Sequence, residues 1–400
     1  MSNVLPFSAI MPSKSIAAKV ATLPYDVMNR SEAAAMAKGN PLSFLHITRS
    51  EIDLPAEIDP YSDEVYAKAD ENWRALRNAK LAQDAVPAYY VYSLVMDGRR
   101  QTGIVATPAV ADYDQNIILK HERTRKEKED DRTRHISTLR AQTGPVFLTY
   151  KDDPTIDAIV ARTMKGEPLF DFTAEDGITH TGWRVDDADT EALQKAFAAI
   201  PNLYIADGHH RAASASRTCA LLNGDGESDR FLAVIFPAGQ LKILAYNRLL
   251  FDLNGLSSAQ LLDAIGKVAA VTPDATPIPE KPGDVRVYLE GKWWRITLPE
   301  DNSLSAIDAL DVSRLQALIL HPIFGIDDPR TSKRIDFVGG IRGTAELEKR
   351  VDSGEAKAAF SMYPTTLDQL MAIADEGGIM PPKSTWFEPK LRDGLFVHEI

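Results

Sequence analysis

The segment spanning residues 203–222 constrains the fold of this chain more than any other. Residues 203–206 are an apolar run, and residues 212–222 are rich in alanine. Between them stand five polar or small residues: Asp207, Gly208, His209, His210 and Arg211. A short apolar run, a glycine and then residues of high helix propensity predict a strand, a tight turn and a helix. We therefore expect a mixed fold in which this polar turn opens a helix.

The chemistry of the turn predicts an anion site. A helix N-terminus leaves backbone N–H groups without partners and carries a partial positive charge. Gly208 allows close approach of the backbone, and Asp207 can cap the turn or hold a cation. His209, His210 and Arg211 add donors, and the planar fork of Arg211 suits a phosphate. The alternative is a capped helix start whose polar side chains face solvent.

Composition excludes several classes of protein. The 400 residues predict two or three packed units, and 45 Lys and Arg against 57 Asp and Glu give a net charge of −12. We expect no nucleic-acid partner, because binding phosphate backbones needs a basic surface. The single cysteine, Cys219, forbids an intramolecular disulfide, and the longest apolar runs fall far short of the roughly 20 residues of a membrane helix. A cytoplasmic protein with no membrane partner is expected, and its oligomeric state is left open.

Four parts are expected along the chain. These are an N-terminal α/β part at 1–115, a core at 116–250 that holds the turn, a small αββ module at 251–310, and a C-terminal α/β part at 311–400 that completes the core. The Pro-rich stretch at 272–282 and the change of composition around it suggest that the module is an insertion.

Local patterns predict individual elements. Residues 31–38 suggest a helix capped by Ser31, and residues 42–47 a short strand. Apolar residues at helical spacing predict a helix over 61–81. Asp97-Gly98 between two Val- and Tyr-rich runs predicts a hairpin, and Glu290-Gly291 a second one. Helices are also expected within 120–142, 256–268, 311–320 and 344–351.

Several segments together resemble the uncharacterised family DUF 1015. They occur in the expected order and spacing: Pro24-Tyr25-Asp26-Val27, Ser43-Phe44-Leu45-His46, His121-Glu122-Arg123-Thr124, Asp131-Arg132, the Asp207 to Arg211 turn, and Pro382-Lys383-Ser384-Thr385. The turn itself resembles the phosphate-binding signature of the ParB/sulfiredoxin-like fold. This resemblance implies an α+β (mixed α/β) fold with a ParB/sulfiredoxin-like core, additional α/β elements and a small inserted module.

That superfamily includes sulfiredoxins, CTP-hydrolysing partition proteins and free serine kinases. Sulfiredoxins carry a cysteine in the turn, whereas Cys219 lies eight residues beyond Arg211. Partition proteins add basic DNA-binding helices, which the net charge of −12 does not support. The free serine kinases are the most similar group, because their turn also reads Asp-Gly-His-His-Arg.

Phosphoryl transfer requires a phosphate cradle, a divalent cation and a group that orients or deprotonates the nucleophile. Asp26 and Glu122 are candidate bases, although each is also explained as a turn-stabilising or solvated carboxylate. His210 is a third catalytic candidate. Asp207 and Glu122 are the candidate ligands of Mg²⁺.

Further phosphate contacts are predicted outside the turn. Arg123 and Thr124 lie in a charged segment that is either a solvated face or a lid. Arg342 lies in a glycine-rich turn at 339–343 that lacks the ending of a P-loop, and Lys383 lies in the tail.

The anion turn and the family resemblance together imply a kinase that uses ATP or ADP with Mg²⁺ to phosphorylate a hydroxyl of a small-molecule substrate, and the resemblance to free serine kinases makes free L-serine the best guess. Two alternatives stay open. One is a nucleotide-sensing regulatory protein that hydrolyses slowly or not at all, and the other is a phosphate-ester hydrolase that uses water as the nucleophile.

Overall fold

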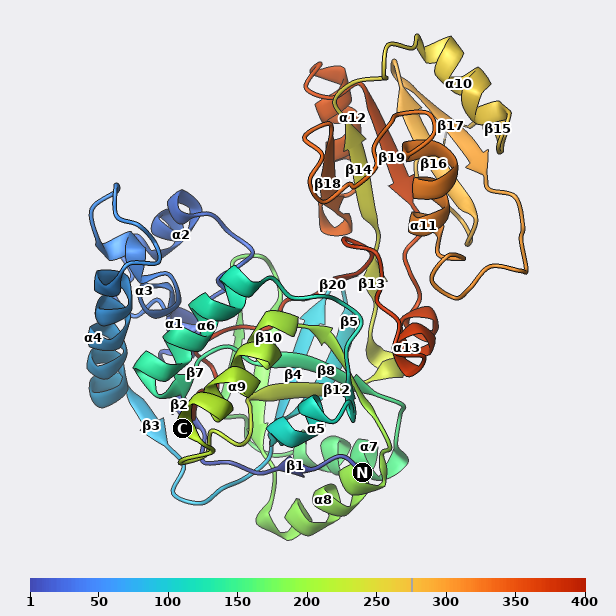
Figure 1. Cartoon of the computed structure of the whole chain (residues 1–400). Helices are drawn as coiled ribbons and strands as arrows, with labels where there is room; N and C mark the ends of the chain where they lie inside the picture. Colours follow the sequence, from blue (N-terminus) through green and yellow to red (C-terminus); the bar gives the residue numbers. More distant parts are fainter. Residues whose placement is uncertain (275) are drawn as a thin grey trace. The chain divides into compact units, whose positions relative to one another are not determined.

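A computed structural model describes residues 1–274 and 276–400 of the chain (Figure 1). It divides into two compact units. Unit 1 consists of Met1–Leu241 together with Pro389–Ile400, and unit 2 consists of Lys242–Glu388. The chain therefore leaves unit 1, builds unit 2, and returns for its last residues.

Unit 1 is built on a nine-stranded mixed sheet with the order β6-β11-β8-β12-β5-β4-β10-β9, and β1 pairs with β5. The pairs β11/β6 and β12/β8 are parallel, and the others are antiparallel. The bounds are β1 (Val4–Leu5), β4 (Tyr90–Met96), β5 (Arg99–Pro108), β6 (Ile118–Leu119), β8 (Val146–Tyr150), β9 (Phe170–Thr173), β10 (Thr179–Arg184), β11 (Leu203–Asp207) and β12 (Ala233–Pro237).

Two short ribbons and twelve helices complete unit 1 among the residues described. The ribbons pair β2 (Ile10–Pro12) with β3 (Leu81–Gln83) and β7 (Ala141–Gln142) with β21 (His398–Glu399). The helices are α1 (Ala17–Val20), α2 (Arg30–Ala37), α3 (Leu45–Thr48), η1 (Ser50–Asp53), α4 (Asp63–Lys80), α5 (Val110–Asp114), α6 (Lys126–Leu139), α7 (Pro154–Thr163), η2 (Asp187–Asp189), α8 (Thr190–Ala199), α9 (His209–Leu222) and η3 (Ala238–Gln240).

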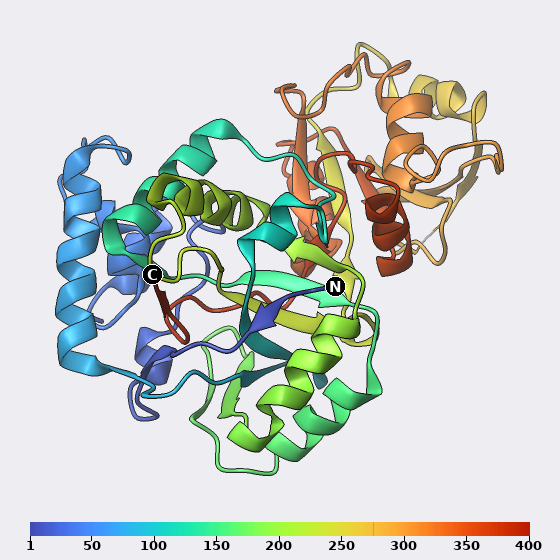
Figure 2. The same cartoon turned by 60° about the horizontal axis from the view of Figure 1, so that its bottom comes forward.

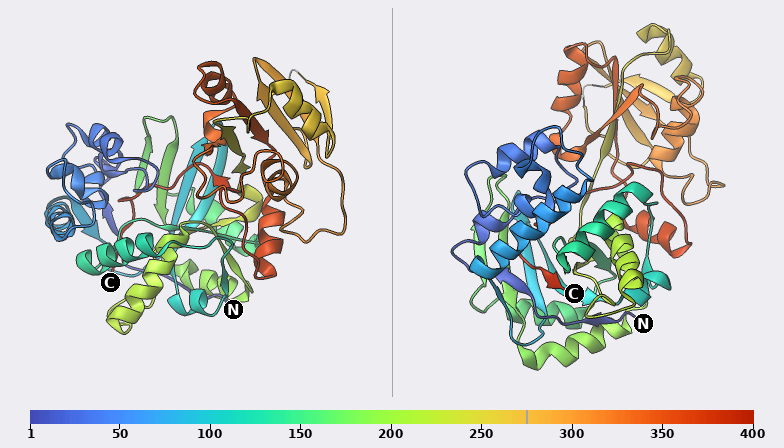
Figure 3. Two further views of the ribbon diagram at one scale, coloured as in Figure 1. Left: turned by 45° about the horizontal axis from the view of Figure 1, so that its top comes forward. Right: turned by 60° about the vertical axis from the view of Figure 1, so that its left-hand side comes forward.

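The main core of unit 1 joins the central strands to the helices. Leu148, Ile205 and Ile235 from three strands are fully buried together with Ile156 of α7 and Phe197 of α8. Helices α7 and α8 lie side by side (Figure 2). At one side of the unit, α2, α3 and α4 gather beside α6 (Figure 3), around a second core that includes Trp73 and Phe44.

Unit 2 holds a six-stranded antiparallel sheet with the order β15-β17-β16-β19-β14-β18 and a short pair of β13 with β20. The strands are β13 (Ile243–Leu244), β14 (Tyr246–Leu250), β15 (Ala270–Pro273), β16 (Asp284–Leu289), β17 (Lys292–Thr297), β18 (Ile335–Gly339), β19 (Ala358–Met362) and β20 (Trp386–Phe387). The helices are α10 (Ser258–Gly266), α11 (Asp311–Leu315), η4 (Gln316–Leu320), η5 (Gly340–Arg342), α12 (Ala345–Asp352) and α13 (Leu367–Asp375).

The α+β class expected from the sequence is confirmed by these mixed sheets and helices. The periodic helix over 61–81 is α4, and the two hairpins form at Asp97-Gly98 and Glu290-Gly291 as β4/β5 and β16/β17. No helix among the described residues is long and apolar enough to span a membrane.

Three local expectations differ from the structure. Helix α2 is capped by Asn29, whose side chain accepts from the N–H of Glu32, so Ser31 lies inside the helix and is not its cap. Asn29 is the cap because it forms a capping box with Glu32: the Asn29 side chain accepts from the Glu32 N–H, and the Glu32 side chain accepts from the Asn29 N–H. The strand expected at 42–47 is wrong: Leu45–Thr48 form the helical turn α3. Phe44 and Leu45 are adjacent and both buried, as are Ile47 and Thr48, a pattern that fits a helical turn and not the alternation of a strand with one buried face.

The unit boundaries also differ from the four-part division. The residues of the expected module at 251–310 share one sheet with β14, β18 and β19, so they do not form a body of their own. Of the C-terminal part at 311–400, Pro389–Ile400 belong to unit 1 and the remainder to unit 2.

Candidate functional site

The predicted strand, turn and helix at 203–222 are present as β11, Gly208 and α9. Gly208 has φ 94°, and a Cβ placed there would lie 3.1 Å from Arg211 Nε. Only glycine adopts this conformation without strain. The register of β11 against β8 shifts between Ile205 and Asp207, and such irregularities re-aim side chains at the end of a strand. The local sequence thus turns the chain sharply into α9.

The first turn of α9 leaves backbone donors available. The N–H of Ala212 donates to Gly208 O at 3.0 Å, which is the first hydrogen bond of the helix. The N–H groups of His209, His210 and Arg211 precede it and have no intrahelical acceptor. No hydrogen bond to these three groups is found within residues 1–274 and 276–400. The turn therefore has the donors that an anion requires.

Asp207 is held by cations. Its Oδ1 accepts from the N–H of Gly208 at 2.8 Å, and its Oδ2 lies 3.0 Å from Lys390 Nζ and 4.0 Å from an Arg211 nitrogen. Burial acts to raise the pKa of Asp207, but Lys390 and Arg211 outweigh it and hold the pKa well below its ordinary value. Asp207 is therefore an ionised carboxylate that shapes the turn.

His209 is enclosed by the segment at 121–122. Its side chain is 5% exposed, its ring meets the His121 ring edge-on with centroids 4.5 Å apart, and its Nδ1 lies 3.7 Å from Glu122 Oε2. Burial, followed by the neighbouring His121, lowers the pKa of His209 well below its ordinary value. Burial also lowers the pKa of His121, to about 4. Both rings are therefore neutral at pH 7.

His210 faces the residues that lead into α6. The N–H of Arg125 donates to His210 Nε2 at 3.0 Å, so the ring carries its proton on Nδ1. Burial and the charge of Arg125 lower the pKa of His210. The two histidines of the turn thus contribute no positive charge at neutral pH, and the attraction for an anion comes from the helix end and from Lys390.

Arg211 takes part in an interior charged cluster. One of its terminal nitrogens donates to Pro145 O, and its Nε has no hydrogen-bond partner in the described residues. Together with Arg132, Tyr25 and Asp393 it lines a cavity of about 30 Å³, enough for a water molecule or two. The Arg132 guanidinium lies 4.1 Å above the Tyr25 ring. The Arg211 side chain is 11% exposed, so it is largely but not fully enclosed.

Asp393 sits at the centre of this cluster. It is 2% exposed, and its Oδ1 has no hydrogen-bond partner among the residues described. A Cβ at position 144 would lie 2.5 Å from that oxygen, which is why Gly144 is needed there. Burial raises the pKa of Asp393 to about 7, against the opposing charge of Arg211. Asp393 is thus a carboxyl group that changes charge near neutral pH beside the turn.

The two candidate bases lie in different surroundings. Asp26 is exposed and makes no hydrogen bond or ion pair that the described residues reveal. Its charge nevertheless acts on the pKa values of His210, Arg211 and Asp393. Glu122 is half-exposed and directed at His209. Which of the two accepts a proton from a substrate stays a prediction.

The two candidate ligands of Mg²⁺ both contact other protein groups. Both oxygens of Asp207 are engaged, by Gly208 and Lys390, and Glu122 approaches His209. Among the described residues no group of three or more His, Cys, Asp or Glu side chains could hold a metal ion. That Asp207 and Glu122 bind Mg²⁺ together with nucleotide phosphates stays a prediction.

The other predicted phosphate contacts are dispersed. Thr124 donates to Glu129, and Arg123 is exposed in the same segment. Arg342 and Lys383 belong to unit 2, where Lys383 Nζ donates to the Tyr246 hydroxyl at 3.2 Å. Their roles at a phosphate stay predictions.

Sequence reasoning missed Lys390 and Asp393 as site residues. Both lie in Pro389–Ile400, which returns to unit 1 after the whole of unit 2. No spacing or motif marks them, because their relation to the turn exists only in the folded chain. Arg132 and Tyr25 had a weak signal, since both stand within the segments that carry the family resemblance.

Comparisons with known proteins agree with that resemblance. A model of the family described as a protein of unknown function, DUF1015, matches residues 4–313. No match is found among curated proteins.

Similar solved structures include three proteins. A free serine kinase in complex with AMP is 14% identical (TM-score 0.36; 71% of this chain and 88% of that chain). C-terminally truncated SbnI from Staphylococcus aureus is 10% identical (TM-score 0.40; 74% of this chain and 87% of that chain). A conserved hypothetical protein from Pyrococcus furiosus is 15% identical (TM-score 0.36; 70% of this chain and 91% of that chain).

Proposed function

The chain belongs to the DUF1015 family of proteins of unknown function, and for this member we propose a nucleotide-dependent kinase that phosphorylates a hydroxyl of a small metabolite. One observation carries the proposal. The first turn of α9, which follows β11 after Gly208 alone, presents three backbone N–H donors for which no acceptor is found among the described residues. Free L-serine is the acceptor we test first.

The turn supplies the phosphate cradle. Backbone N–H groups of His209 and His210 donate to phosphate oxygens, and the helix end favours their negative charge. Lys390 and Arg211 lie behind the turn and add positive charge, while Asp207 keeps both in place. ATP or ADP supplies the phosphoryl group in this proposal.

The transfer balances with Asp26 as the base. The acceptor hydroxyl oxygen attacks the terminal phosphorus of the nucleotide, a new O–P bond forms, and the bridging P–O bond breaks. The nucleotide leaves with one phosphate fewer. Asp26 takes the hydroxyl proton, which a carboxylate near the attacking oxygen accepts as charge develops. His210, with its proton on Nδ1, is placed to donate a hydrogen bond nearby.

The test uses the purified full chain with roughly millimolar ATP or ADP, Mg²⁺ in excess over the nucleotide, and a panel of amino acids and polyols. Mass spectrometry of the products is expected to find a phosphorylated acceptor and an equal amount of nucleotide that has lost one phosphate. Free phosphate as the sole new product would instead indicate a hydrolase.

Variants separate a kinase from a nucleotide sensor. Asp26→Asn removes the base but keeps the shape of the side chain, so turnover is expected to fall at least about 100-fold while nucleotide binding persists. Glu122→Gln is the matched variant and is expected to retain most turnover. A protein that binds nucleotide yet forms no product with any acceptor contradicts the proposal.

A further inference from the structure

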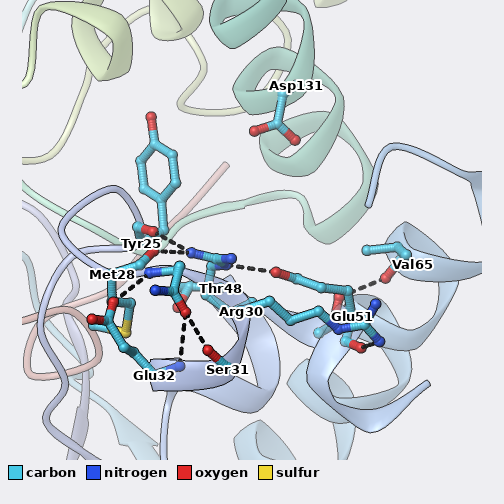
Figure 4. A network of polar contacts seen from close by, with 12 residues as sticks. Tyr25, Met28, Arg30, Ser31, Glu32, Thr48, Glu51, Val65 and Asp131 are labelled. Atoms are coloured by element: carbon cyan, nitrogen blue, oxygen red, sulfur yellow. Dashed lines mark hydrogen bonds and ion pairs between the residues drawn. The ribbon is translucent and has the colours of Figure 1, made fainter. Parts of the chain in front are cut away.

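A second, larger cavity adjoins the turn. Its volume is about 300 Å³, and its walls come from the 25–28 segment, from α3 with η1, from the start of α4 and from α6. In Figure 4, Tyr25, Glu51 and Asp131 approach the same space from these different elements. Asp26 and Arg125 line this cavity, and Arg125 also donates its backbone N–H to His210. The cavity is therefore connected to the turn through Arg125.

Hydrogen bonds hold the floor of the cavity in place. Arg49 Nε donates to Glu51 Oε1 at 2.6 Å, and its Nη1 donates to the carbonyl oxygens of Tyr25 at 2.8 Å and Met28 at 2.6 Å (Figure 4). Arg30 donates to Leu54 O at 2.9 Å. These bonds tie the backbone on either side of Asp26 to η1, so this wall of the cavity is held by the protein itself.

Charges on the walls favour an anionic ligand. Glu51 is paired with Arg49, and Asp131 is paired with Arg132 at 2.9 Å. After these pairs, Arg125 and Lys128 remain as cations against Asp26. Lys128 Nζ donates to the Tyr61 hydroxyl at 2.8 Å, an arrangement that leaves its charge uncompensated. The cavity thus carries net positive charge within a chain of net charge −12.

One oxygen in the cavity wall is available for a second contact. The Glu51 side chain is 6% exposed, and its Oε2 accepts no hydrogen bond within the described residues, although its Oε1 does. A carboxylate oxygen that lacks a protein donor can accept a hydrogen bond from a ligand that reaches it. A hydroxyl or ammonium group of a bound molecule is such a donor.

We infer that this cavity is the acceptor site and that its ligand is a carboxylate-bearing hydroxy compound. The carboxylate lies at Lys128 and Arg125, a hydroxyl lies at Asp26 and faces the turn, and a further donor meets Glu51. This identification of the acceptor class rests on the proposed kinase function, whereas binding to the cavity does not. A carboxylate with a hydroxyl occurs both in hydroxy acids and in hydroxy amino acids, and the two are distinguished by experiment.

The experiment measures binding to the full chain by calorimetry without nucleotide, using four probes of similar size. L-serine and glycerate carry a carboxylate and a hydroxyl, whereas ethanolamine and glycerol lack the carboxylate. We expect at least one of the first two to bind at least tenfold more tightly than the last two. Serine binding better than glycerate identifies a hydroxy amino acid, and the reverse identifies a hydroxy acid. Equal weak binding of all four overturns the inference.

Two variants locate the binding. Lys128→Gln is expected to weaken the better ligand at least tenfold, because it removes the cation and keeps a donor for Tyr61. Lys126→Gln is the matched control: Lys126 is on the same helix, its side chain is 83% exposed and pairs with Asp130, and it does not line the cavity. Its ligand affinity is expected to stay within twofold of the wild-type value.

The outcomes separate this inference from the proposed function. Unchanged affinity in Lys128→Gln, or an equal loss in Lys126→Gln, overturns the acceptor site even if the chain phosphorylates a substrate. Specific binding that needs Lys128, without any phosphorylated product, overturns the kinase and leaves the cavity as a binding site for that ligand.

Discussion

Asp393 makes the stability of unit 1 depend on pH in a direction opposite to that of most carboxylates. Its carboxyl group is 2% exposed beside Arg211. Burial raises its pKa from the ordinary value of 3.8 to about 7. Between pH 4 and pH 7 the folded chain therefore keeps a proton on Asp393 that the unfolded chain has released.

The sign and size follow from proton linkage. A folded state that binds more protons than the unfolded state loses stability as pH rises. The difference between the two pKa values corresponds to roughly 4 kcal/mol, lost progressively from pH 4 to pH 7 and constant above. Asp393→Asn cannot ionise, so the variant is expected to lack this loss. Relative to wild type, it gains roughly 4 kcal/mol over the same interval.

Urea unfolding at pH 4.5, 6, 7 and 8 measures the effect. Each transition is fitted separately, because the chain has two units and a single two-state fit does not apply. Asp225→Asn is the control, since its side chain is 81% exposed, and its profile is expected to run parallel to that of wild type. Parallel profiles for Asp393→Asn and wild type would refute the reasoning about the buried carboxyl group.

The remaining predictions concern the turn and its supports. Gly208→Ala and Gly224→Ala each place a side chain at a positive φ, 94° and 72°, at the two ends of α9, so each is expected to lower the free energy of unfolding by about 1–2 kcal/mol. Only Gly208→Ala is expected to weaken nucleotide binding, measured by calorimetry. An equal loss of nucleotide affinity in both variants argues against the turn as the binding site. Lys390→Met removes the ion-pair partner of Asp207, so the free energy of unfolding is expected to fall by about 2 kcal/mol, seen as a lower urea midpoint. Nucleotide binding is expected to weaken as well. An unchanged midpoint contradicts the ion pair. Gly144→Ala pushes a Cβ against Asp393 and is expected to lower the free energy of unfolding by about 1–3 kcal/mol, measured by urea unfolding. An unchanged free energy of unfolding would mean that the Asp393 carboxyl group lies elsewhere.

Helices and turns were predictable from sequence where the residues that determine them are neighbours in the chain. The helix α4 follows from apolar residues at helical spacing, and the β11 to α9 turn follows from an apolar run, a glycine and an alanine-rich segment. The helix α2 was predicted with the wrong cap because Ser31 and Asn29 are both good caps, and the deciding partner Glu32 is three residues beyond Asn29.

The candidate site was only partly predictable. The turn residues and Asp26 are marked by motif and residue type. The charge state of His209 and His210 was not, because their pKa values depend on burial and on neighbours from other segments. Lys390 and Asp393 arrive from the far end of the chain, and a single sequence carries no sign of that closure.

The most direct test of the phosphate turn is a crystal structure of the full chain soaked with a non-hydrolysable ATP analogue. The account predicts phosphate density within hydrogen-bond distance of the backbone N–H groups of His209 and His210, with the terminal phosphate directed toward Asp26. Phosphate density bound elsewhere in the chain, with the first turn of α9 left empty, would contradict it.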